Sequence, residues 1–154
     1  MKFFKGFYFA GRGIAAAVKE RNFRFHLCVM AFAIYFAARF YSFTAEKWAI
    51  FLLTCGAVLS IEAVNTAIER LCDKVTMQND PLIRTTKDCA AGAVLISAII
   101  SVIVGILLFW NKDIFTLIIL FFSESLRLLT LLIAIAAAWC FVFLPELIKS
   151  ASHN

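Results

Sequence analysis

Long apolar runs separated by short polar breaks dominate this chain of 154 residues. They cover approximately residues 25–43, 47–74 and 87–110, and Asn79-Asp80-Pro81 supplies a turn signal between the second and the third. A helix needs about 20 predominantly apolar residues to cross the hydrocarbon core of a bilayer. The pattern therefore predicts three membrane-spanning helices joined by short loops.

The two ends of the chain follow different patterns. Residues 1–20 mix aromatic side chains with lysine and arginine, which is typical of an amphipathic helix that lies along a membrane surface. Residues 128–144 form a further apolar run that stops before Pro145 and predicts a fourth span. Residues 114–122 are apolar but too short to cross, which indicates an interfacial piece. One long bent helix through the whole region is the alternative.

Composition supports an all-α membrane protein. Hydrophobic residues make up 63% of the chain and the mean hydropathy is +0.90, whereas soluble domains contain about 45–50% apolar residues. We therefore expect one membrane domain at residues 1–110 and a C-terminal extension at residues 111–154. A nucleic-acid-binding role would need a basic soluble domain, and the pattern leaves no room for one. The five cysteines include no CxxC pair, so neither zinc nor a disulfide framework is indicated.

The basic residues predict the orientation of the spans. The formal net charge is +5, and lysine and arginine are concentrated before the first span and around the loop between the second and the third. Basic loops stay on the cytoplasmic side of a membrane. We therefore expect the N-terminus and residues 74–87 in the cytoplasm, and a fourth span would return Lys149 to the same side.

The second span carries polar residues on one face. Counting 100° per residue from Glu62, Asn65 lies at about −60°, Thr66 at about +40°, Glu69 at about −20° and Asp73 at about +20°. We call Glu62, Asn65, Glu69 and Asp73 the acidic stripe. A carboxylate inside a membrane costs several kcal/mol unless it is paired, neutralised or solvated. Two glutamates that repel each other on one face therefore indicate a functional site.

The chemistry of the acidic stripe suits phosphoryl transfer. A divalent cation would relieve the repulsion, and oxygen ligands favour Mg²⁺ or Ca²⁺. Lys87-Asp88 opens the third span and Glu20 ends the N-terminal segment, so groups from three elements are expected to meet at one depth. Carboxylates could then hold the metal, a lysine could contact phosphate oxygens, and a base could activate a hydroxyl.

Other interpretations of the same residues stay open. Glu62 and Glu69 could form a proton relay in a non-enzymatic transport bundle, or a helix–helix contact. Asp73 could be a solvated helix end, and Lys87-Asp88 could be an interfacial ion pair at a helix start. Lys5 could face lipid instead of binding a ligand.

Two motifs, EAVNTAIERLCD at 62–73 and KDCAAGAVL at 87–95, resemble the small prokaryotic diacylglycerol kinase family. That family includes the undecaprenol kinases of Gram-positive bacteria, and ERNFRFH at 20–26 resembles this group in particular. The resemblance covers about residues 1–110. It implies a homotrimer of three-span subunits in the bacterial cytoplasmic (inner) membrane, with ATP, Mg²⁺ and active sites shared between neighbours.

The resemblance also implies roles for individual residues. Glu62 would be the general base on the lipid hydroxyl, and Glu20 and Glu69 would hold the metal ion that bridges the ATP phosphates. Four residues would contact the nucleotide or order the site: Lys5, Asn65, Lys87 and Asp88. The implied reaction moves the γ-phosphoryl of ATP to a membrane lipid, undecaprenol in preference to diacylglycerol, for lipid recycling. Residues 114–154 lie outside the resemblance.

Overall fold

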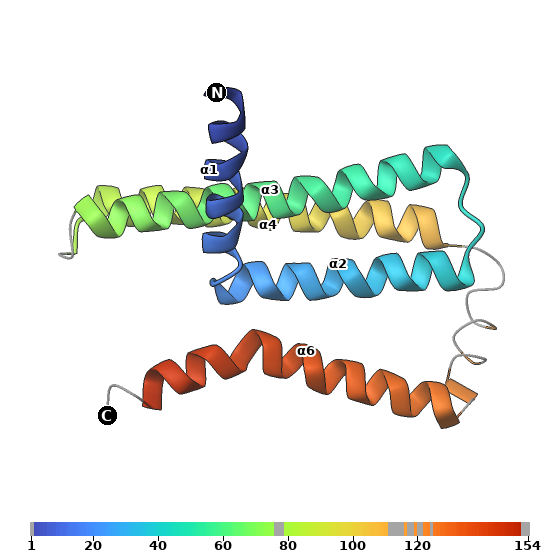
Figure 1. The fold of residues 1–154 in the computed structure, drawn as a ribbon. Helices are drawn as coiled ribbons and strands as arrows, with labels where there is room; N and C mark the ends of the chain where they lie inside the picture. Colours follow the sequence, from blue (N-terminus) through green and yellow to red (C-terminus); the bar gives the residue numbers. More distant parts are fainter. Residues whose placement is uncertain are drawn as a thin grey trace.

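The computed structural model describes residues 2–75, 79–110, 116, 119, 122–123 and 125–151. These residues form five helices (Figure 1): α1 (Lys2–Ala17), α2 (Arg21–Phe40), α3 (Ala45–Val75), α4 (Pro81–Phe109) and α6 (Ser125–Ala151). All but α1 are long and apolar enough to cross a membrane. The prediction of an all-α membrane protein with a fourth, C-terminal span is confirmed. The expected interfacial piece at 114–122 lies mostly outside the described residues.

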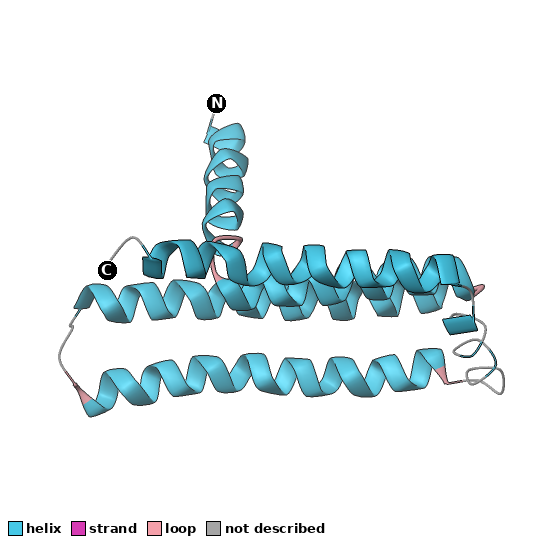
Figure 2. Cartoon of the chain, turned by 90° about the horizontal axis from the view of Figure 1, so that it is seen from below, coloured by secondary structure: helices cyan, strands magenta, loops and turns pink. Residues whose placement is uncertain are grey.

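Four helices lie along a common axis, with α2 and α4 antiparallel to α3 and α6, and α1 crosses them (Figures 1 and 2). Helix α3 packs along α4 and also against α2, and α2 packs against α6 on its other side. The end of α3 and the C-terminal end of α6 lie toward the same end of the bundle as the turn between α1 and α2. An amphipathic helix that crosses the direction of the spans has the orientation expected at a membrane surface.

Helix α4 begins earlier than the predicted third span. The side chain of Asp80 accepts hydrogen bonds from the backbone N–H groups of Leu82 and Ile83, at 2.7 and 3.1 Å. Pro81 takes the first helical position, where its missing N–H costs nothing. This N-terminal cap starts the helix at residue 81, so Lys87 lies in its second turn instead of at its start.

Helix α6 extends beyond the predicted apolar run on both sides and continues through Pro145. A proline inside a helix cannot donate to the carbonyl four residues earlier, and its ring crowds that carbonyl, so the helix bends instead of ending. Figure 1 shows the bend in the C-terminal part of α6.

Aromatic side chains pack together at the end of the bundle opposite the turn between α1 and α2. The ring of Phe109, at the end of α4, lies 5.0–6.0 Å from four other rings. These belong to Phe36, Tyr41, Phe43 and Phe51. The Tyr41 hydroxyl also donates to the carbonyl of Phe109 at 2.9 Å. We call these five residues the aromatic cluster; it joins α2, α3 and α4 far from the acidic stripe.

Candidate active site

Part of the acidic stripe is buried inside the bundle. Glu62 is 2% exposed and Asn65 is 4% exposed, and the neighbouring Thr66 is buried with them on α3. The other buried residues of α3 are apolar and recur at helical spacing, so the polar group continues a face that packs against other helices. Further along α3, Glu69 is half-buried and Asp73 is exposed. The stripe therefore runs from a buried glutamate to an accessible helix end.

Asn65 links the buried and accessible parts of the stripe. Its Nδ2 donates to Oε1 of Glu69 at 3.1 Å, one helical turn away. Its Oδ1 is buried and has no hydrogen-bond partner among the described residues. A buried amide oxygen without a donor is costly, and most buried polar atoms in native proteins have a partner in the protein or in ordered water. The oxygen is therefore an acceptor that the described side chains leave available.

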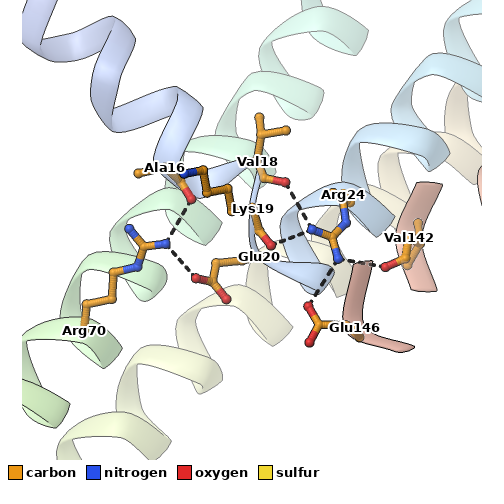
Figure 3. A network of polar contacts seen from close by, with 8 residues as sticks. All are labelled: Ala16, Val18, Lys19, Glu20, Arg24, Arg70, Val142 and Glu146. Atoms are coloured by element: carbon orange, nitrogen blue, oxygen red, sulfur yellow. Dashed lines mark hydrogen bonds and ion pairs between the residues drawn. The ribbon is translucent and has the colours of Figure 1, made fainter. Parts of the chain in front are cut away.

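Glu20 approaches the stripe from the turn between α1 and α2. We call this turn, residues 18–20, the elbow. Oε1 of Glu20 accepts a hydrogen bond from Nη2 of Arg70 at 2.7 Å, and the same nitrogen donates to the carbonyl of Ala16 at 3.0 Å (Figure 3). The carboxylates of Glu69 and Glu20 both lie near enough to Glu62 to act on it electrostatically. Three of the predicted carboxylates are therefore brought together.

The remaining predicted residues are placed differently. Lys87 forms an ion pair with Asp73, which joins α4 to the accessible end of the stripe. Asp88 is exposed on the next position of α4. Lys5 is exposed in the N-terminal half of α1, which projects away from the spans in both views (Figures 1 and 2). Within one chain, Lys5 is thus not brought to the stripe, and its role stays a prediction.

The donor atoms suit a hard cation. Glu20, Glu62 and Glu69 offer carboxylate oxygens, and Asn65 adds the unpaired amide oxygen, a set that favours Mg²⁺ or Ca²⁺. Among the described residues, no group of three or more histidine, cysteine or acidic side chains is close enough together to hold a metal.

Two arginines of the site were not singled out from the sequence. Arg70 orients Glu20, and Arg24 is 3% exposed and contacts the elbow and α6 (Figure 3). Both lie in the motifs at 20–26 and 62–73, but the sequence predicts a site role for neither. The available signal was Arg70 itself, since a cation next to Glu69 on a spanning helix needs a partner.

Comparison with known proteins places the chain in a family. The model of the family described as prokaryotic diacylglycerol kinase matches residues 8–109. This chain belongs to that family. It is a multi-pass membrane lipid kinase, and the alternative of a non-enzymatic transport bundle is set aside.

The relatives of this kinase differ in the lipid they are named for. It is 43% identical over 112 residues to the undecaprenol kinase of Bacillus subtilis, which covers 72% of this chain and 90% of the relative. It is 40% identical over 101 residues to the diacylglycerol kinase of a Synechocystis species, which covers 64% of this chain and 57% of that relative. A diacylglycerol kinase of Helicobacter pylori is 26% identical over 98 residues, covering 64% of this chain and 77% of that relative. No solved structure matches the chain.

Proposed function

We propose that this kinase phosphorylates the terminal hydroxyl of undecaprenol with ATP and so returns the lipid to its phosphorylated form. Buried Glu62, on the same face of a spanning helix as the hydrogen-bonded Asn65 and Glu69, is the observation that carries the chemistry. The preference for undecaprenol is supported by the 43% identity to a named undecaprenol kinase over 90% of its length. Diacylglycerol is the competing acceptor.

In the proposed reaction, Glu62 accepts the proton of the lipid hydroxyl. The lipid oxygen forms a bond to the γ-phosphorus of ATP, while the bond between that phosphorus and the β–γ bridging oxygen breaks and ADP leaves. A base for this step must lie within hydrogen-bond reach of the hydroxyl. Burial of Glu62 inside the membrane domain would keep water away from the reacting groups.

The other stripe residues would position the phosphates. Glu69 and Glu20 would hold Mg²⁺, which when bound neutralises charge on the phosphate oxygens. Asn65 keeps Glu69 oriented through its Nδ2. Lys87 would exchange Asp73 for a phosphate oxygen, and this exchange costs little because both partners of the pair are more than a third exposed. Asp88 and Lys5 would complete the nucleotide contacts.

We also propose that the kinase works as a homotrimer in the bacterial cytoplasmic membrane, with its N-terminus in the cytoplasm. The basic residues concentrated at the elbow end of the bundle support this orientation. A neighbouring subunit could also bring its own Lys5 to the stripe.

The proposal is tested with the purified full-length chain in mixed micelles, radiolabelled ATP and Mg²⁺. Undecaprenol and diacylglycerol are supplied in turn at equal mole fraction, and kcat/KM is measured for each. We expect kcat/KM to be about tenfold or more higher for undecaprenol, a difference within reach of substrate pocket contacts. A higher value for diacylglycerol would refute the lipid assignment, and no labelled lipid from either acceptor would refute kinase activity.

A further inference from the structure

Helix α6 lies beyond the part of the chain that the family model matches, which ends at residue 109. It nevertheless packs along α2, whose first residues leave the elbow that carries Glu20. The polar contact between these two helices is therefore a connection from the C-terminal extension to the candidate active site (Figure 3).

One buried guanidinium makes this connection. Nη1 of Arg24 donates to the carbonyl of Lys19 in the elbow. Nη2 donates to the carbonyl of Val142 at 2.8 Å and lies 3.3 Å from Oε1 of Glu146, both on α6. The planar guanidinium presents its donors in a rigid fork, so it can bind acceptors on two elements at once and hold them at a set separation.

The bend in α6 places these acceptors. Pro145 has no N–H to donate to the carbonyl one turn earlier, and helices bend at such positions. Val142 and Glu146 flank this turn, one on each side of the proline, and both face Arg24 (Figure 3). We call Arg24, Val142 and Glu146 the brace.

The elbow is held from its other side by α3. Arg70 binds both the carbonyl of Ala16 and the carboxylate of Glu20. The elbow is thus held by two arginines. Arg70 donates to the carboxylate of Glu20, and Arg24 donates to the carbonyl of Lys19. A shift of the elbow would move Glu20 relative to Glu62 and Glu69.

We propose that Glu146 and the bend at Pro145 are positioning elements of the kinase site. They hold Arg24, which fixes the elbow and thereby sets Glu20 against the acidic stripe. This inference rests on the proposed function, because the role of Glu20 as a metal ligand belongs to it. Under this proposal, helix α6 contributes to the position of Glu20 in the kinase site.

Two variants of the full-length chain test the brace. Glu146→Gln removes the charge that faces Arg24 and keeps the side-chain size. Pro145→Ala restores a backbone donor and favours a straight helix, so helix instability cannot explain its effect. Glu46→Gln is the matched control, because it removes a carboxylate at the first turn of α3, at the far end of the bundle.

The first readout is trypsin cleavage at the elbow in detergent, which does not depend on kinase activity. Lys19 in the elbow and Arg21, the first residue of α2, are exposed cleavage sites, and all three variants keep them. We expect faster cleavage at these sites in Glu146→Gln and Pro145→Ala, and the wild-type rate in Glu46→Gln. Wild-type cleavage rates in both brace variants would overturn the proposal.

The second readout is the Mg²⁺ concentration that gives half-maximal kinase activity. Residues that orient metal ligands commonly change metal affinity by about 10-fold or more when they are replaced. We expect an increase of about 10-fold in both brace variants and no change in the control. Loss of active enzyme alone would lower kcat without moving this midpoint. Faster cleavage with an unchanged midpoint would overturn the link to Glu20. A wild-type chain without kinase activity would refute the proposed function, while the cleavage result would still decide whether the brace holds the elbow.

Discussion

Replacement of Glu62 by Gln is the sharpest test of the catalytic assignment. Gln has nearly the same shape, and Glu62 is almost fully buried, so packing should be retained. Glu62 forms no ion pair with a described residue, so its replacement by Gln breaks none. We therefore expect the thermal midpoint in detergent to stay the same or to rise.

The effect on catalysis should be large. A positioned general base typically contributes about 10²- to 10⁴-fold to the rate, which corresponds to about 2.7–5.4 kcal/mol in the activation barrier. We expect kcat to fall by this factor. The KM for ATP should change little, because Glu62 lies at the buried end of the stripe and Lys87 at its accessible end.

The assay compares kcat and both KM values for wild type, Glu62→Gln and the control Glu46→Gln. Size-exclusion chromatography in detergent checks that the oligomer is unchanged. Turnover within about threefold of wild type, at an unchanged thermal midpoint, would refute Glu62 as the base, since it falls well below the contribution of a general base. An equal loss in Glu46→Gln would show that any lost carboxylate on α3 impairs the enzyme.

Four further outcomes are expected. Lys87→Gln should raise the KM for ATP about 10- to 100-fold, the range for a lost hydrogen bond to a charged group. Asp73→Asn should change the free energy of unfolding by less than about 1 kcal/mol, because the ion pair of Asp73 with Lys87 is exposed. An equal KM for ATP in Lys87→Gln and Asp73→Asn would contradict a phosphate contact by Lys87. Chelation by EDTA should abolish lipid phosphorylation and Mg²⁺ should restore it; full activity in EDTA would exclude the metal assignment. Phe109→Ala should lower the free energy of unfolding by about 3 kcal/mol or less, below the range for fully buried aromatic truncations, because the half-buried Phe109 loses its contacts with four rings. Its kcat per folded molecule should stay near wild type, and a selective loss of kcat would mean that the aromatic cluster affects the site.

Much of the candidate site could be predicted from the sequence because it lies on one helix. The spacing of Glu62, Asn65 and Glu69 determines that they share a face in any regular α-helix. The structure agrees, since Asn65 bonds to Glu69 one turn away and Glu62 is buried beside them. Helix boundaries were less predictable. The cap at Asp80 starts α4 before its apolar run, and α6 continues through Pro145 beyond its apolar run.

The sequence by itself determined the membrane setting, the number of spans and the polar face of α3. These depend on composition and on the helical repeat, which are properties of neighbouring residues. Only the tertiary structure decided that Arg70 orients Glu20 and that Arg24 joins the elbow to Glu146, because those partners are 50 and 122 residues apart. Their meeting depends on how α3 and α6 pack around the elbow, and lipid-facing apolar surfaces carry little information about which helix lies beside which. In this kinase the acidic stripe can be predicted from the spacing of residues on one helix, whereas the long-range contacts of Arg70 and Arg24 cannot.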